Sequence, residues 1–261
     1  MLFLHGWGLS HRSYRHALAR LREVGSRVHA PALPGFGGTD ALPSDSFTLE
    51  GYADWVAEFL DEVGVDEPVF CVGHSFGGGV AIQLAVRHPE RVRSLVLVNS
   101  IGGATWQRDD GDSPAISMAE RPWWDWGIHF PRDVLPTREA VRVVPTILRE
   151  TVPNLVESPL AMWRAGKLAR TADLTEELEE LKRRRLPVVV LWGARDKLIP
   201  RESFDDLCAA IGSEGEVVEG SHAWLLADPD AFGEVITNHV EVAQLARRLD
   251  QSKWRFWRGA A

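Results

Sequence analysis

The sequence lacks the features that mark several large classes of protein. It has two cysteines among 261 residues, Cys71 and Cys208, which do not make a disulfide framework. No apolar run has the length of a membrane span, and the opening Met-Leu-Phe-Leu-His-Gly lacks the basic start and the length of a secretory signal. Internal repeats and low-complexity segments are missing too. These absences predict a cytoplasmic protein.

A surplus of positive charge is also missing. There are 29 Lys and Arg residues against 37 Asp and Glu, a net charge of -8, which argues against nucleic acid or an anionic membrane as a partner reached by charge alone. The length fits one large α/β domain with an insertion. Tryptophan, by contrast, is abundant, with 11 residues. Five of these fall in one central region: Trp106, Trp123, Trp124, Trp126 and Trp163.

The most informative stretch lies at residues 69–79, Val-Phe-Cys-Val-Gly-His-Ser-Phe-Gly-Gly-Gly. An apolar run ends abruptly in small residues around one serine, which predicts a buried strand, a tight turn and the start of a helix. Gly73 and Gly77 flank Ser75 at the Gly-X-Ser-X-Gly spacing, where a β-carbon would crowd the turn. The sequence therefore predicts that the Ser75 side chain stands alone at the crest of this turn.

Strand and helix patterns alternate along most of the chain. We expect strands at residues 2–4, 28–33, 69–74, 93–98, 187–192 and 216–218, and helices at 12–24, 48–60, 79–88, 202–211 and 229–249. Strand runs this apolar are typical of strands covered on both faces. The pattern predicts an α/β fold with a mostly parallel central sheet and helices on both faces.

The alternation stops between Gly103 and about Arg170, a segment rich in tryptophan and proline with a helical pattern at residues 137–150. We interpret it as a cap inserted into the domain. The predicted organisation is a first core part at residues 1–102, a cap at 103–170 and a second core part at 171–261. The five tryptophans named above either pack as core or line a substrate pocket, and the sequence leaves both open.

Three loops at the predicted carboxyl ends of strands carry a serine, an acid and a histidine. A serine hydroxyl needs an adjacent base to act as a nucleophile at neutral pH, and that base needs a carboxylate to fix its tautomer. Ser75, Asp196 and His222 supply these groups at the edge of the sheet where functional residues gather. Asp196 could instead begin a surface turn. His222 is the one histidine of nine that follows the last strand in a turn.

Five motifs in one order resemble the α/β-hydrolase superfamily over nearly the whole chain. They are His5-Gly6-Trp7-Gly8, Pro34-Gly35-Phe36-Gly37, Gly73-His74-Ser75-Phe76-Gly77-Gly78, Trp192-Gly193-Ala194-Arg195-Asp196 and Gly220-Ser221-His222. The resemblance implies an eight-stranded, mostly parallel sheet, a helical cap after the sixth family strand, and neither a metal nor an organic cofactor. It also implies that the backbone N–H groups of Trp7 and Phe76 form an oxyanion hole, and that His5 and His74 have structural roles.

Some relatives carry the acid where this chain has Asn99, which is not acidic, so Asp196 is favoured. The resulting hypothesis is a serine hydrolase that cleaves an ester, thioester or related acyl bond of a small apolar substrate through an acyl-enzyme. A carbon–carbon bond hydrolase and a cofactor-free haloperoxidase-like enzyme stay open, because such members of the superfamily also use serine. A non-catalytic ligand receptor that retains the triad is the alternative of another class.

The resemblance also exposes a difference at the beginning of the chain. The family normally has two strands before the one that ends in His-Gly, and here Met1 opens that strand directly. We expect either a natural start upstream or another element that covers the sheet edge, such as a second subunit in a homo-oligomer. A basic, aromatic stretch near the C-terminus, residues 253–258, is too short for a strong membrane anchor, so a membrane partner is disfavoured.

Overall fold

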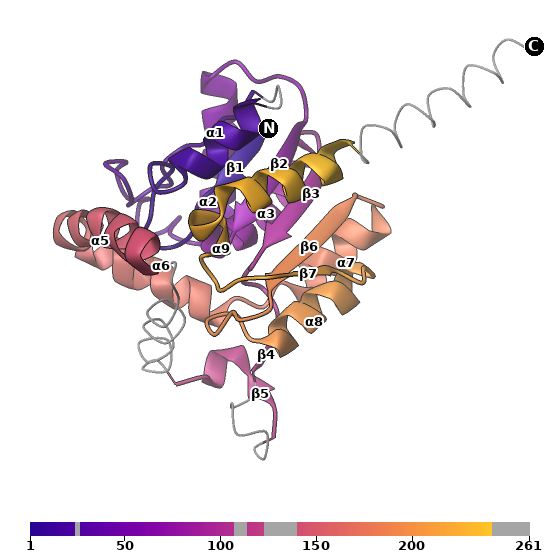
Figure 1. The fold of residues 1–261 in the computed structure, drawn as a ribbon. Coiled ribbons are helices and arrows are strands. Elements are labelled where there is room, and N and C mark those ends of the chain that lie inside the picture. The colour runs from indigo at the N-terminus through magenta and orange to yellow at the C-terminus, as the bar shows by residue number, and fades with distance from the viewer. Residues whose placement is uncertain (24–26, 107–113, 123–139, 242–261) are drawn as a thin grey trace, which may run out of the picture.

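The computed structural model describes residues 1–23, 27–106, 114–122 and 140–241. Its centre is a parallel sheet of five strands in the order β1-β2-β3-β6-β7 (Figure 1). The strands are β1 (Leu2–Leu4), β2 (Val69–His74), β3 (Val92–Val98), β6 (Val188–Gly193) and β7 (Glu216–Val218). The predicted mostly parallel sheet with flanking helices is confirmed.

Successive side chains of the strands enter two separate cores, one on each face of the sheet. Cys71, Leu95 and Leu97 pack in one core, whereas their neighbours Val72 and Val96 pack in the other. The first core is closed by α2 (Leu49–Glu62), α3 (Phe76–Arg87), α7 (Thr175–Arg183) and α8 (Arg201–Ile211), and the second by α1 (Arg15–Glu23), α9 (Trp224–Ala227) and the helix at 229–241. Burial on both faces explains why the strand sequences are continuously apolar.

The helices begin and end where local chemistry favours it. The Thr48 hydroxyl accepts the Gly51 N–H at 3.1 Å and caps the start of α2. Helix α8 ends at Gly212, which adopts the left-handed conformation with φ of 73°. The predicted helix at 229–249 is helical as far as residue 241, and the rest lies outside the described residues.

The predicted strand at residues 28–33 is wrong. This segment makes a single parallel bridge, between His29 and Leu2, with one backbone hydrogen bond in each direction around it. Pro31 has no N–H to donate to a ladder, and the Leu33 N–H donates to the His5 side chain instead of to a strand. The described sheet therefore has five strands rather than the six expected from the sequence.

The segment at 103–170 holds a small antiparallel pair, β4 (Thr105–Trp106) and β5 (Ile116–Ser117), the 3-10 turn η1 (Met118–Glu120), and the helices α5 (Ala140–Glu157) and α6 (Pro159–Thr171). The predicted helical pattern at 137–150 belongs largely to α5, which continues seven residues further, while 137–139 lie outside the described residues. Figure 1 shows α5 and α6 together at one side of the molecule. No helix in the described ranges is long and apolar enough to cross a membrane.

Candidate active site

Ser75 lies in the sharp turn between β2 and α3. Its backbone has φ of 53° and ψ of -117°, values that a non-glycine residue rarely adopts and that cost about 1–3 kcal/mol. The surrounding backbone keeps it there: the Ser75 N–H donates to the Val98 carbonyl at 3.0 Å, and the Ser75 carbonyl accepts the Gly78 N–H at 2.9 Å. Strain maintained in this way points to a functional residue.

The glycines on each side of Ser75 are required by close packing. A β-carbon at Gly77 would come 2.3 Å from the carbonyl oxygen of Leu4 in β1, and one at Gly73 would come 2.5 Å from the carbonyl oxygen of Gly77. Both contacts are shorter than any real β-carbon tolerates and involve backbone, which cannot move aside cheaply. The Gly-X-Ser-X-Gly spacing is therefore explained by the geometry of this turn.

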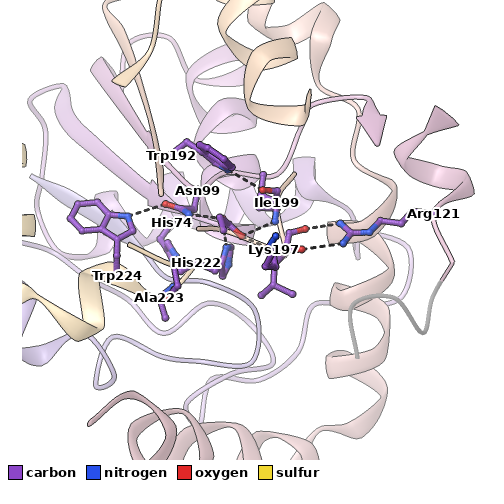
Figure 2. A network of polar contacts seen from close by, with 12 residues as sticks. His74, Asn99, Arg121, Trp192, Lys197, Ile199, His222, Ala223 and Trp224 are labelled. Carbon is purple, nitrogen blue, oxygen red and sulfur yellow. Dashed lines mark hydrogen bonds and ion pairs between the residues drawn. The ribbon is translucent and has the colours of Figure 1, made fainter. Parts of the chain in front are cut away.

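His222 and Asp196 are in direct contact. His222 Nδ1 lies 2.8 Å from Asp196 Oδ2, and Figure 2 labels His222 within the network of contacts around it. The Asp196 side chain is fully buried, whereas the His222 side chain is 12% exposed. A carboxylate only accepts hydrogen bonds, so Nδ1 carries the hydrogen and Nε2 is the basic nitrogen of the neutral ring. This is the orientation that a general base needs.

The Asp196 carboxylate is fixed by four N–H donors. Oδ1 accepts the backbone N–H groups of Leu198 at 2.8 Å and Ile199 at 2.9 Å, and Oδ2 accepts Asn99 Nδ2 at 2.5 Å together with His222. The alternative of a simple exposed surface turn does not describe this buried, fully bonded carboxylate.

Asn99 is a residue of the site that the sequence did not identify as a partner of the acid. Its amide donates to Asp196, and its Oδ1 accepts the indole N–H of Trp224 at 2.9 Å (Figure 2). Asn99 also adopts a positive φ of 46° at the end of β3. The sequence did offer one signal for Asn99: it is a polar residue directly after a buried strand. Such positions lie at the edge of a parallel sheet where functional residues gather.

Arg121 links the acid loop to the segment at 103–170. The side chain is 1% exposed, and its two terminal nitrogens donate to the carbonyl groups of Leu198 at 2.6 Å and Lys197 at 3.3 Å (Figure 2). The guanidinium also lies 5.6 Å from the centre of the Trp106 ring. The backbone of this loop is thus fixed in two ways: its N–H groups donate to the Asp196 carboxylate, and its carbonyl groups accept from Arg121.

A chain of hydrogen bonds joins the loop of His222 to the loop after β1. His74 Nε2–H donates to the His222 carbonyl at 3.0 Å, Tyr14 O–H donates to His74 Nδ1 at 2.8 Å, and the Gly6 N–H donates to the Tyr14 oxygen at 3.1 Å. Burial holds the pKa of His74 well below its usual range, so the ring is neutral and can fill both roles. Ser75 directly follows His74, whose ring centre lies 5.0 Å from that of His222.

The two predicted oxyanion donors lie at the ends of regular elements. Phe76 is the first residue of α3, and Trp7 follows β1. The Gly6 carbonyl accepts His5 Nδ1–H at 2.9 Å, and because this carbonyl and the Trp7 N–H belong to one trans peptide, the bond also fixes the direction of the N–H. Within the described ranges, no carbonyl accepts the N–H of Trp7 or Phe76.

The predicted pocket tryptophans divide into three cases. Trp106 is buried against Arg121, Trp163 is 64% exposed on α6, and Trp123, Trp124 and Trp126 lie outside the described residues. Among the residues that the structure describes, no group of three or more His, Cys, Asp or Glu side chains is placed to hold a metal ion.

A parallel sheet between two helical layers, with a serine in a strained strand-to-helix turn and a bonded acid–histidine pair on later loops, defines the α/β-hydrolase fold. The sequence profile of the Alpha/beta hydrolase family matches residues 1–235. The chain belongs to this family and is an enzyme of the hydrolase class.

Individual relatives agree with this classification. A pimeloyl-[acyl-carrier protein] methyl ester esterase of Aromatoleum aromaticum is 31% identical over 264 residues, which cover 92% of this chain and 97% of that protein. A Mycobacterium phage D29 protein, provisionally named a non-heme haloperoxidase, is 30% identical over 244 residues, 90% of this chain and 85% of its own. The solved esterase of Exiguobacterium antarcticum has the same fold, with a TM-score of 0.69 and 22% identity over 92% of this chain and 91% of that one.

Proposed function

We propose that this protein is a serine hydrolase that cleaves an ester, thioester or related acyl bond of a small apolar substrate. Ser75 is the nucleophile, His222 the general base and Asp196 the residue that orients it. The observation that carries the proposal is the hydrogen-bonded pair of His222 and Asp196, whose loop is bonded to His74, the residue next to the strained serine. The esterase relatives support the choice of an ester bond.

In the proposed mechanism, Ser75 Oγ attacks the carbonyl carbon while its proton passes to His222 Nε2. The carbonyl oxygen takes the electron pair and accepts hydrogen bonds from the Trp7 and Phe76 N–H groups. The bond to the leaving group then breaks as His222 gives the proton to the departing alcohol or thiol. The acyl group remains attached to Ser75 as an acyl-enzyme. A water, deprotonated by His222, attacks this acyl group and releases the acid.

We also propose that residues 103–170 form the cap over this site. Helices α5 and α6 contact the loop that carries Trp7, and Arg121 contacts the loop that carries Asp196. Such a position lets the segment bound the substrate pocket. Location in the cytoplasm and association through the sheet edge stay predictions from the sequence.

Turnover of p-nitrophenyl esters with acyl chains of increasing length tests the proposal. We expect the wild-type protein to exceed a Ser75→Ala variant clearly, and Asp196→Asn to lower kcat by about 10⁴-fold, because the base loses its orientation and its charged form is no longer stabilised. Asp205→Asn, an exposed acid on α8, is the matched control and should keep its rate. Wild-type turnover equal to that of Ser75→Ala would favour the ligand receptor.

A haloperoxidase-like activity is the second candidate, favoured by the phage relative. It would use the same acyl-enzyme, with hydrogen peroxide in place of water as the attacking group, so that a peracid is released. Measuring the ratio of peracid to acid at equal ester turnover distinguishes the two, and predominant hydrolysis at millimolar peroxide would exclude this candidate.

A further inference from the structure

Helix α5 holds the loop after β1 through one buried amide. Asn154 is 4% exposed; its Nδ2 donates to the Gly8 carbonyl at 3.0 Å, and its Oδ1 accepts the Gly37 N–H at 2.8 Å. Both partners have a fixed role as acceptor or donor, so the orientation of the amide is determined. Thr151, three residues earlier on the same face of α5, donates to the same Gly8 carbonyl at 3.2 Å.

The contact reaches Trp7 through two peptide groups that are joined by a hydrogen bond. The peptide between Gly8 and Leu9 is held at its carbonyl by α5, and its N–H, that of Leu9, donates to the Gly6 carbonyl at 3.3 Å. The Gly6 carbonyl belongs to the peptide whose N–H is that of Trp7. Because each peptide group is planar and trans, fixing one end fixes the direction of the other.

A second set of contacts holds the Trp7 side chain to α6. Its indole N–H donates to the Met162 carbonyl at 2.7 Å, and a β-carbon at Gly166 would lie 3.3 Å from the ring. Ser10, at the other end of the loop, donates to Glu150 of α5 at 2.5 Å. Trp7, Gly8 and Ser10, which follow the Gly6 carbonyl in the chain, are therefore each bonded to α5 or α6.

We propose that Asn154 is a positioning residue for the oxyanion N–H of Trp7, so that the placement of α5 sets the rate of the chemical step. This inference rests on the proposed function, and it assigns to α5 a role in stabilising the transition state besides enclosing the substrate. Contacts that hold the Trp7 N–H matter most when the carbonyl oxygen becomes charged, so they act on kcat more than on KM.

Asn154→Leu tests this, since it keeps the volume and removes both amide hydrogen bonds. We expect kcat to fall about 10- to 100-fold with KM within about twofold. Arg164→Met is the matched control: it removes two bonds from α6 to Ser44 without touching the loop after β1, and should leave kcat within about twofold. Equal kcat values in the two variants would overturn the proposal.

A trifluoromethyl ketone shaped like the substrate adds a more specific measurement. Ser75 Oγ bonds to its carbonyl carbon, the serine proton passes to His222, and the oxygen takes the negative charge of the transition state. We expect its inhibition constant to rise in Asn154→Leu by the factor lost from kcat/KM, while inhibition by the acid product stays unchanged. A loss of both affinities in parallel would indicate a general disturbance of the pocket and overturn the proposal.

Hydrogen exchange separates this inference from the proposed function. The amides of residues 6–9 should exchange about tenfold faster in Asn154→Leu than in the wild type, and should be unaffected in Arg164→Met. If the wild type shows no ester turnover, the proposed function fails while this measurement still decides whether Asn154 holds the loop. If Asn154→Leu does not fold, Asn154→Asp replaces it in this measurement. It keeps an oxygen that accepts the Gly37 N–H and removes the N–H that donates to the Gly8 carbonyl. Unchanged exchange at residues 6–9 in Asn154→Asp would contradict the proposal.

Discussion

His5 and His74 are fully buried, and each uses both ring nitrogens in hydrogen bonds near the site. His5 Nδ1–H donates to the Gly6 carbonyl and its Nε2 accepts the Leu33 N–H at 2.8 Å, while His74 joins Tyr14 to the His222 carbonyl. Burial lowers the pKa of His5 to about 4 and holds that of His74 well below its usual range. Both act as neutral rings that orient peptide groups.

The lowered pKa values predict that acid destabilises the fold. Below the unfolded-state pKa of about 6.5 the unfolded chain binds protons that these folded histidines do not, so the free energy of unfolding falls by about 1.4 kcal/mol per pH unit for each histidine. The loss for His5 runs from about pH 6.5 down to about 4. We expect urea denaturation at pH 5 and 7 to show this difference.

His74→Gln should reduce the pH dependence of stability, because it removes one titrating ring. The exposed His16→Gln is the control and should leave the dependence as in the wild type. Equal slopes in all three proteins would contradict the prediction.

Tyr14→Phe should lower the catalytic rate in addition to lowering the stability of the fold. The change leaves the buried Gly6 N–H and His74 Nδ1 without their common partner, at a cost of about 1–3 kcal/mol in stability, and it breaks the connection between the Trp7 and His222 loops. Tyr52→Phe is the matched control, since that buried hydroxyl bonds only to the Pro34 carbonyl among the described residues. We expect both to unfold at lower urea, and only Tyr14→Phe to lower kcat by about tenfold.

Individual site residues differ in how far the sequence could reveal them. The Ser75 turn was predictable from local glycine spacing, and the contact of His222 with Asp196 followed from chain order. The roles of Asn99 and Tyr14 were not predictable, because their hydrogen-bond partners lie 97 and 60 residues away in the chain. No local sequence pattern indicates such a hydrogen bond. The roles of polar side chains depend on which loops the fold brings together.

At the level of elements, α3 packs so closely on β1 that it tolerates no side chain at its first glycine. Gly77→Ala should destabilise the fold by about 3 kcal/mol or more, because the new β-carbon would meet the Leu4 carbonyl at 2.3 Å. At Gly79, two residues further along α3, a β-carbon would meet side-chain carbons of Ile101 at 2.8 Å and of Leu174 at 3.5 Å rather than backbone. Gly79→Ala also gains helix propensity, so we expect a smaller loss of stability. Urea denaturation compares the two, and equal losses would contradict this packing argument.

Elements with a clear apolar pattern were the most predictable ones. β2, β3 and β6 are apolar runs, and α2 has its buried residues at helical spacing, so pattern and structure agree. The segment at 28–33 has similar composition, but its proline prevents a continuous ladder and it makes one bridge. The β4–β5 pair is two residues long on each side, too short for a periodic signal.

For the whole molecule, the segment at 103–170 supports the site from two sides. Arg121 bonds the acid loop, and Asn154 with Thr151 bonds the loop after β1. The sequence predicted an insertion here from the loss of alternation, but not that its buried polar groups contact the site. Arg121 and Asn154 stand out only because they are buried, and burial cannot be read from the sequence. In an exposed helix the same residue types would be ordinary.

The bonds of Asn154 also bear on the order of events when the chain folds. They join residues 146 and 117 positions apart, so they close only after long stretches of chain have been organised, whereas the helices form locally and early. A refolding molecule should therefore pass through a stage that has native-like helix content while the loop of Trp7 is not yet held by α5. After dilution from urea, ester turnover should return more slowly than circular dichroism at 222 nm. Coincident recovery at every final urea concentration would show that α5 docks in the same step as the sheet forms.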